Sequence, residues 1–307
     1  MASIQSVAHL GRRPAPASAV HVVKSYVALT KPRIIELLLI TTVPTMFVAA
    51  KHLPSFGLIL LTLAGGSLAA GGANAFNMVY DRDIDAIMER TKNRPLVTGE
   101  MSPSSATLFA LALEIASFAL LWTTVNLLSA VLAVAATAFY VFVYTMWLKR
   151  STKQNIVIGG AAGAVPVLVG WSAVTDHLAV APFTLFGVIF LWTPPHFWAL
   201  AVRYRDDYAA ADVPMLPAVA HIQRVMTEIM IYSVATVALT LVFGPVAHLN
   251  WGYEISAAIL GTLFCWKAIQ LARTPDAKHA MRLFGYSISY LTLLFFAMGI
   301  DAVVQHP

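Results

Sequence analysis

The stretch that decides the fold is an apolar run that ends in a cluster of aspartates, residues 71–85, GGANAFNMVYDRDID. Its first half continues an apolar segment that begins at residue 57, and its last five positions carry three carboxylates. A helix that spans a membrane needs about 20 mainly apolar residues. The stretch therefore predicts a spanning helix that ends near Tyr80 and delivers acidic side chains to one membrane face.

The composition of the whole chain also indicates a membrane protein. Its 307 residues are 59% hydrophobic and 11% charged, whereas a soluble domain carries about 25% charged residues. A surface so poor in charge has to face lipid. The single cysteine, Cys265, excludes an internal disulfide. The net charge of +5 is explained by basic residues at the inner membrane face, so no nucleic-acid partner is expected.

Nine segments of the chain are apolar enough to span a bilayer. The sequence predicts an all-α integral membrane protein, a bundle of nine transmembrane helices. The expected spans are residues 34–50, 57–80, 105–123, 127–147, 155–174, 179–201, 225–246, 251–272 and 283–304.

The distribution of Lys and Arg predicts how this bundle is oriented. Of the 20 basic residues, only Lys51 lies in an outer connection, and Lys267 lies near the inner end of the eighth span. Cytoplasmic loops carry an excess of Lys and Arg. We therefore expect a cytoplasmic N-terminus and a candidate site that opens at the cytoplasmic face. The inner loops are then residues 1–33, 81–104, 148–154, 202–224 and 273–282.

The chain shows no sign of a second domain. We expect residues 1–25 to form a mobile cytoplasmic tail and residues 26–307 to form a single transmembrane domain. Residues 1–24 lack the apolar core of a secretory signal peptide. A bacterial cell (inner) membrane is the expected location. The alternative is a mitochondrial inner membrane, because the leader contains Arg and Ser and no acidic residue.

The first acidic cluster has the spacing of one helix face. Asn77, Asp81 and Asp85 follow one another at intervals of four residues, which places them about 6 Å apart along a helix. Two carboxylates and an amide oxygen are ligands that suit Mg2+. Carboxylates at a helix C-terminus also oppose the helix dipole. Their presence there therefore predicts a nearby cation.

A second acidic pair follows the sixth span, and basic residues lie between the two clusters. Asp206 and Asp207 stand at the inner end of that span, so the two clusters can face each other around a metal-bound diphosphate. Arg94 in the first long loop and Lys149 in the next inner loop are natural anchors for such a group. The other interpretation of these basic residues is ordinary positive-inside anchoring.

One ionisable residue lies inside an apolar span. His196 follows Pro194 and Pro195, and ionisable groups within membranes are functional candidates. Prolines remove helix hydrogen bonds, so we expect the backbone to open locally there. The alternative is a histidine that is hydrogen-bonded within the protein core. Glu114, deep in the third span, is the feature that most favours a transporter, although it too can be a packing residue.

Taken together, these stretches resemble the UbiA superfamily of intramembrane prenyltransferases, and more closely its heme-farnesylating branch, the protoheme IX farnesyltransferases or heme O synthases. The Asn77 to Asp85 run indicates the superfamily, whereas WTPPHFW at 192–198 is typical of the heme branch. The similarity extends over most of the chain from residue 26. The remaining matching stretches are LTKPR at 29–33, RPL at 94–96, LKRST at 148–152, NIVIGG at 155–160, DY at 207–208 and PMLP at 214–217.

The resemblance implies roles for individual residues. It implies Mg2+ as cofactor and His196 as the residue that contacts heme, and it makes Asp206 part of the second acidic motif. The superfamily's Asp-x-x-x-Asp spacing is absent, because Ala211 stands where the second aspartate is expected and Asp212 follows it. The implied metal ligands are Asn77, Asp81, Asp85 and Asp207. The implied diphosphate-binding residues are Lys31, Arg33, Arg94, Lys149, Arg150 and Tyr208.

The resemblance also implies a reaction. The farnesyl group of farnesyl diphosphate is transferred to the 2-vinyl group of heme b with addition of water, which gives heme O and diphosphate. Heme b is here a substrate, and a heme A synthase or a terminal oxidase is the implied acceptor of the product.

Three other functions remain compatible with the sequence. A prenyltransferase of the same superfamily could act on a quinone precursor or chlorophyllide, although the His196 segment argues against it. A membrane transporter would use intramembrane polar groups, but the acidic residues here gather at one face. A heme-handling scaffold would not need Asp81, Asp85 or Asp207.

Overall fold

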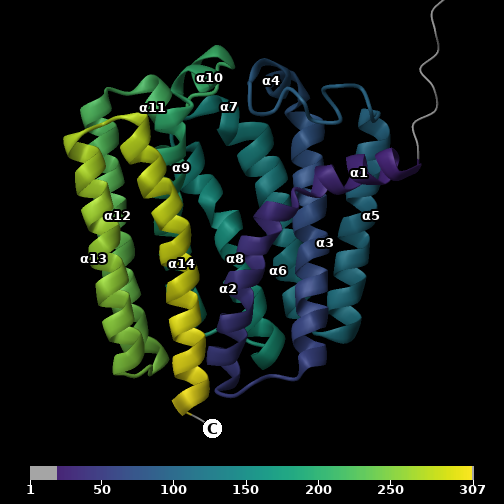
Figure 1. The fold of residues 1–307 in the computed structure, drawn as a ribbon. Coiled ribbons are helices and arrows are strands. Elements are labelled where there is room, and N and C mark those ends of the chain that lie inside the picture. Colours follow the sequence, from purple (N-terminus) through teal and green to yellow (C-terminus); the bar gives the residue numbers. More distant parts are fainter. Residues whose placement is uncertain (1–18, 306–307) are drawn as a thin grey trace, which may run out of the picture.

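The computed structural model describes residues 19–305, and all regular secondary structure in this range is helical, without strands. Eight helices are long and apolar enough to cross a membrane, and they run side by side in one bundle (Figure 1). The bounds of these long helices are α3 Phe56–Tyr80, α5 Pro103–Thr124, α6 Leu127–Ala138 continued by η1 Phe139–Leu148 and α7 Lys149–Ser151, α8 Asn155–Thr175, α9 Val180–Arg203, α12 Ile222–Ala247, α13 Trp251–Arg273 and α14 Ala277–Gln305.

The segment expected as the first span, 34–50, lies within α2 (Pro32–Ala50). Within it, Ile40–Ala50 is an apolar helix whose side chains the structure describes without a gap. The helix packs between α8 and α14, so it is part of the bundle. The structure therefore confirms an all-helical protein with many candidate spans.

The chain begins, within the described part, with a helix that crosses the others. α1 (Ala19–Thr30) lies at a steep angle to the spans at one end of the bundle (Figure 1). The tail expected at 1–25 thus overlaps α1, because residues 19–25 are helical; residues 1–18 lie outside the described residues. Ser25 on this helix is buried and donates a hydrogen bond to Glu100 at 2.9 Å, which ties α1 to the first long loop.

Local sequence signals explain where the helices of the first half begin. Ser55, Ser102 and Asn126 each accept a hydrogen bond from a backbone N–H three residues further on. This is the usual N-cap interaction, and it fixes the starts of α3, α5 and α6. Pro103 at the first helical position strengthens the second of these starts.

The core combines close helix contacts at glycines, which occur in both halves of the bundle, with a cluster of large side chains. In the first half small residues let helices approach closely: a Cβ at Gly65 would lie 2.5 Å from the side chain of Leu121, and one at Gly72 would lie 2.5 Å from Glu114. The second half, α8 to α14, has a core of large side chains that includes Trp192, Phe243 and Phe295. Gly65 and Gly72 of α3 are therefore sites of close helix packing.

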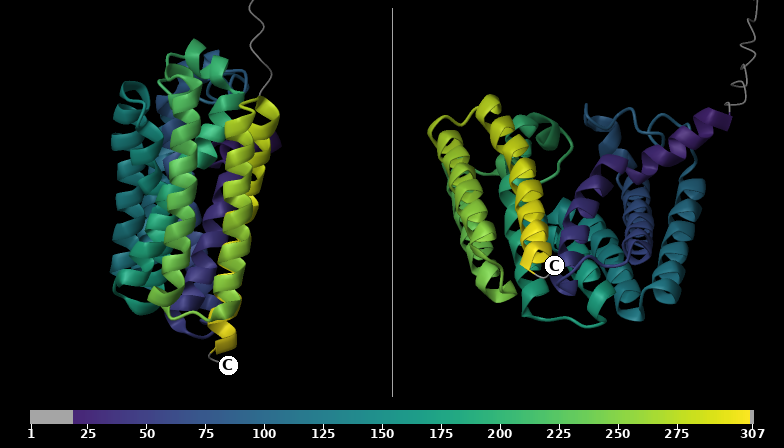
Figure 2. Two further views of the ribbon diagram at one scale, coloured as in Figure 1. Left: turned by 90° about the vertical axis from the view of Figure 1, so that its left-hand side faces the viewer. Right: turned by 60° about the horizontal axis from the view of Figure 1, so that its bottom comes forward.

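The short helices all gather at one end of the bundle. α4 (Arg82–Ile87), α7, α10 (Arg205–Ala210) and α11 (Leu216–Val219) lie at the end opposite the C-terminus of α14 (Figures 1 and 2). We call it the loop end. Both long inner loops, 81–104 and 202–224, belong to it, and they are joined by a buried cluster that includes Ile84, Met88, Tyr208 and Val213. The fold thus brings the two acidic segments to one place.

Candidate functional site

The first acidic cluster lies where α3 ends and α4 begins. Asp81 caps both helices, and its backbone N–H donates to the Asn77 carbonyl at 2.9 Å while that of Asp85 donates to the Asp81 carbonyl at 2.8 Å. The four-residue repeat therefore continues through the junction, as the spacing predicted. Because the helix restarts at Arg82, Asp83 and Asp85 lie in a first turn, where the dipole favours them.

Asn77 is held by three hydrogen bonds that fix its amide. Its Nδ2 donates to Asp81 Oδ2 at 2.6 Å and to Thr145 Oγ1 at 3.1 Å, and its Oδ1 accepts from Lys31 Nζ at 2.9 Å. The partners come from three separate elements of the chain. Thr145 was not expected from the sequence, because an isolated threonine in an apolar span carries no signal.

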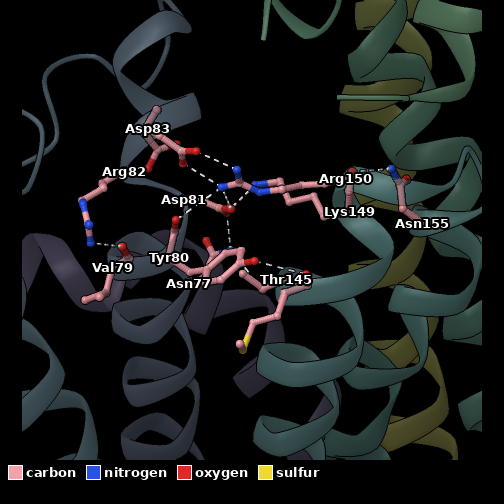
Figure 3. Close-up of polar contacts among 12 residues, drawn as sticks. Asn77, Val79, Tyr80, Asp81, Arg82, Asp83, Thr145, Lys149, Arg150 and Asn155 are labelled. Atoms are coloured by element: carbon pink, nitrogen blue, oxygen red, sulfur yellow. Dashed lines mark hydrogen bonds and ion pairs between the residues drawn. The ribbon is translucent and has the colours of Figure 1, made fainter. Parts of the chain in front are cut away.

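Asp81 is fully buried and is surrounded by cations (Figure 3). Lys149 Nζ donates to Asp81 Oδ2, and Arg150 Nη2 lies 3.6 Å from Asp81 Oδ1. Oδ1 accepts no hydrogen bond within the described part of the chain. A buried carboxylate requires compensation of its charge. The nearby cation that the sequence predicted is therefore provided, in part, by Lys149 and Arg150.

Arg150 links this buried carboxylate to an exposed one. Its guanidinium donates to both oxygens of Asp83, at 2.6 and 2.7 Å, and lies over the ring of Tyr80 at 5.0 Å from the centroid. This bidentate contact lowers the pKa of Asp83 to about 2. Asp83, which points away from the Asn77–Asp81 face, is thus salt-bridged.

The third member of the predicted cluster, Asp85, is paired within its own loop. Arg94 Nη1 lies 2.5 Å from Asp85 Oδ2, and both side chains are largely buried. Thr91 Oγ1 donates to the Asp85 carbonyl at 2.9 Å and closes the loop beneath them. Arg94, predicted as a diphosphate anchor, therefore stands directly at the acidic face.

The cationic residues after η1 reach Asp81 because that segment is a π-helix. Ten residues, Phe139–Leu148, adopt this wider helix, which is uncommon and often found at functional sites. It places Thr145 on Asn77 and Lys149 on Asp81. No residue pattern indicates a π-helix here, since the residues of this segment are those of any apolar span.

Lys31 approaches the cluster from the junction of α1 and α2. Its backbone is left-handed, with φ of 50°, a conformation that costs a non-glycine residue free energy. Burial and the neighbouring Arg94 and Lys149 lower the pKa of its ammonium group. Asn74, one turn before Asn77, donates to the Thr30 carbonyl at 3.0 Å and so supports the junction. The side chain of Arg33, also predicted here, lies outside the described residues.

The second acidic pair lies on α10 in different surroundings. Asp206 is exposed and Asp207 half-buried, and within residues 19–305 neither forms an ion pair. The adjacent Tyr208 is buried, and burial raises its pKa, while the positive charge of the nearby Arg90 acts in the opposite direction. Among the described residues no three His, Cys, Asp or Glu side chains form a ready metal site. The two long loops contact each other through the buried cluster that includes Tyr208.

His196 is buried in α9 among aromatic rings. It stacks on Trp192 and Phe284 with centroid separations of 4.3 and 4.5 Å, and its Nδ1 lies 2.7 Å from Ser287 Oγ. The expected opening at Pro194 and Pro195 is wrong, because α9 runs through both residues as a helix. The proline φ angle suits a helix, and buried packing from both sides keeps the segment in place.

These features define a class of protein, a multi-pass helical membrane protein with a buried, charge-paired oxygen cluster at one end of the bundle. The chain belongs to the UbiA prenyltransferase family, whose model matches residues 38–298. The resemblance inferred from the sequence is confirmed.

Relatives and solved structures agree with this assignment. The chain is 53% identical over 289 residues to protoheme IX farnesyltransferase 1 of Saccharopolyspora erythraea, which covers 93% of this chain and 92% of the relative. The fold is similar to that of a digeranylgeranylglyceryl phosphate synthase, with a TM-score of 0.76, 18% identity and coverage of 92% and 99%. It is also similar to a UbiA homolog from Archaeoglobus fulgidus bound to DMAPP and Mg2+, with a TM-score of 0.64, 17% identity and coverage of 87% and 99%.

Proposed function

We propose that this protein transfers the farnesyl group of farnesyl diphosphate to the 2-vinyl group of heme b, with addition of water, and so forms heme O and diphosphate. The observation that carries the proposal is the buried cluster of Asp81 with Lys149 and Arg150 in a chain 53% identical to a protoheme IX farnesyltransferase. A cluster of carboxylates and cations at a membrane face suits an amphiphilic diphosphate, because its charge can be bound there while its chain lies in the apolar bundle.

The residues of the first cluster fit Mg2+. Asp81 Oδ1 is a buried carboxylate oxygen that accepts no hydrogen bond from the described residues, and carboxylate and amide oxygens are the ligands this ion takes. Asn77, Asp81 and Asp85 would hold it, with Asp207 as a ligand from the second loop. Bound there, Mg2+ would neutralise negative charge on the diphosphate.

The cationic side chains would bind and orient the diphosphate. Arg94 and Arg150 present guanidinium groups, which suit phosphate oxygens, and Lys149 supplies a further charge. As the C1–O bond of the substrate breaks, the diphosphate leaves with the bonding electrons, and these groups stabilise the charge that develops. Lys31, Arg33 and the hydroxyl of Tyr208 complete the proposed set.

The heme side of the reaction would take place against α9. The π electrons of the 2-vinyl group form the new C–C bond to C1 of the farnesyl group. Water then adds to the resulting cation and loses a proton, which leaves a hydroxyethylfarnesyl substituent. The apolar helix walls exclude water from the allylic cation before the C–C bond forms. His196 is the residue proposed to contact heme.

The proposed topology places the loop end in the cytoplasm. With α2 counted as the first of nine spans, the N-terminus and the candidate site are cytoplasmic, in a bacterial cell membrane, because the basic residues concentrate at that end. The test is a cysteine-reactive probe applied to intact cells of a Cys265→Ser background. Lys51→Cys should be labelled from outside, and Asp206→Cys should be labelled only after permeabilisation.

The activity test uses purified protein in detergent with heme b, farnesyl diphosphate and Mg2+, and separates the hemes by chromatography and mass. Heme O should form and should disappear with EDTA. Heme binding without product would instead indicate a heme-handling scaffold. Failure to bind heme would instead favour a prenyltransferase that acts on another acceptor, or a transporter. A heme A synthase or a terminal oxidase is the proposed acceptor of the product.

A further inference from the structure

Ser287 of α14 forms hydrogen bonds with two side chains of α9. Trp192 and His196 lie one turn apart on α9. Trp192 Nε1 donates to the backbone carbonyl of Ser287 at 2.9 Å, and His196 Nδ1 lies 2.7 Å from the Ser287 hydroxyl oxygen. Ser287 is fully buried. It is 91 residues from His196 in the sequence, so nothing in the sequence pairs them.

The position of the Ser287 proton follows from a second short contact. Ser287 Oγ lies 2.6 Å from the carbonyl oxygen of Phe284. Two oxygen atoms at this separation require a hydrogen between them, and a serine hydroxyl has only one. The hydroxyl therefore donates to Phe284 and offers a lone pair to His196. Nδ1 of His196 must then carry its own hydrogen.

We propose that Ser287 is a positioning residue that fixes His196 in the Nδ1–H tautomer and so keeps the lone pair of the neutral imidazole on Nε2. The hydrogen bond made by one ring nitrogen decides the form of the other. The rings of Trp192 and Phe284 restrict rotation of the imidazole. Ser287 thus sets both the orientation of the ring and which nitrogen can act.

The lone pair on Nε2 suits the chemistry of the proposed function, on which this second step of the inference depends. The reaction brings two electron-pair acceptors into the bundle, the heme iron and a proton of the water that adds to the cation. Nε2 can bind either one, whereas the opposite tautomer would present an N–H and could bind neither. The tautomer itself does not depend on the proposed function.

The first experiment measures the tautomer in protein labelled with ¹⁵N-histidine, in detergent and without substrates. His196→Gln identifies the signals of residue 196, and the chemical shifts of the ring nitrogens show which one carries hydrogen. We expect a protonated Nδ1 and a bare Nε2 in the wild type and in Ser287→Thr, and a mixture in Ser287→Ala. A protonated Nε2 in the wild type, or a Ser287→Ala spectrum identical to it, would overturn the proposal.

Ser233→Ala is the matched control. Ser233 is also fully buried, on α12, but its hydroxyl has no hydrogen-bond partner among the described residues. Its removal should leave the His196 signals and turnover unchanged. A change as large as that in Ser287→Ala would show that loss of any buried hydroxyl disturbs the bundle, and it would count against a specific role of Ser287.

The second experiment asks what the Nε2 lone pair binds. Turnover should fall about tenfold in Ser287→Ala, with the KM for farnesyl diphosphate unchanged, and should recover in Ser287→Thr. Iron ligation predicts a heme absorption spectrum that changes in both His196→Gln and Ser287→Ala. Proton acceptance predicts an unchanged spectrum with slower turnover.

Normal turnover in Ser287→Ala would overturn the functional step, even where the tautomer result stands. No turnover in the wild type would count against the proposed function alone.

Discussion

Asp81 and Asp207 lie in the two long loops at the same end of the bundle, yet their surroundings differ. Asp81 is fully buried and contacts Lys149 and Arg150, whereas Asp207 is half-buried and forms no ion pair within residues 19–305. A buried carboxylate without a counter-charge is costly, while one in contact with water is not. The comparison indicates that the ion pairs of Asp81 are part of the folded core, whereas Asp207 is not needed for the stability of the fold.

The largest effect is expected from Asp81→Asn. It should lower heme O formation by at least about 100-fold, because a proposed metal ligand is lost, and should reduce stability, because Lys149 and Arg150 lose their buried partner. Product formation and the thermal midpoint measure the two effects. Asp83→Asn is the matched control, since Asp83 also binds Arg150 but its side chain is 61% exposed. Equal losses of product formation and of thermal stability in both variants would contradict the distinction between buried and exposed carboxylates.

The second prediction concerns competition between cations. Lys149→Gln should bind Mg2+ about tenfold more tightly than the wild type in the absence of substrate, because an ammonium group beside Asp81 repels the ion. Its turnover should nevertheless fall, because a proposed diphosphate anchor is lost. Thermal midpoints against Mg2+ concentration measure the affinity. Weaker Mg2+ binding in this variant would place the ion away from Asp81.

A smaller effect is expected in the second cluster. Asp207→Asn should leave the thermal midpoint unchanged, because the carboxylate supports no ion pair in the described structure. It should raise the Mg2+ concentration needed for half-maximal activity about fivefold, as loss of one of several oxygen ligands would. Asp206→Asn, a change at the more exposed neighbour, should raise this Mg2+ concentration less. A large drop in stability in Asp207→Asn would contradict the comparison.

The smallest effect is a pH dependence at the edge of the first cluster. Folding lowers the pKa of Asp83 to about 2, from about 3.9 in an unfolded chain. The pair with Arg150 therefore contributes stability above about pH 4 and loses it as the pH falls towards 2. The thermal midpoints of the wild type and Asp83→Asn should differ above pH 4 and converge below it. A constant difference down to pH 2 would contradict this origin.

The arrangement of the site follows from the sequence only in part. The spacing of Asn77 and Asp81 predicted that both residues lie on one helix face. The distribution of Lys and Arg predicted that the loops 81–104 and 202–224 lie at the same end of the bundle. The pairing of Asp81 with Lys149 depends instead on a π-helix that no residue pattern marks. The contact of Ser287 with His196 depends on tertiary packing, because it joins two helices that are far apart in the sequence and no local residue pattern pairs them.

The π-helix η1 has a consequence for how the site can change over evolutionary time. A wider turn differs from an α-helical turn by an added residue, and each residue turns an α-helix by about 100°. Insertion or loss of one codon within Phe139–Leu148 can therefore be absorbed by a change between a wide turn and an α-helical turn. In a strictly α-helical span the same change would turn Lys149 and Arg150 by about 100° away from Asp81. In this family member the wide helix thus gives the segment before Lys149 a tolerance to changes of length that an α-helix lacks.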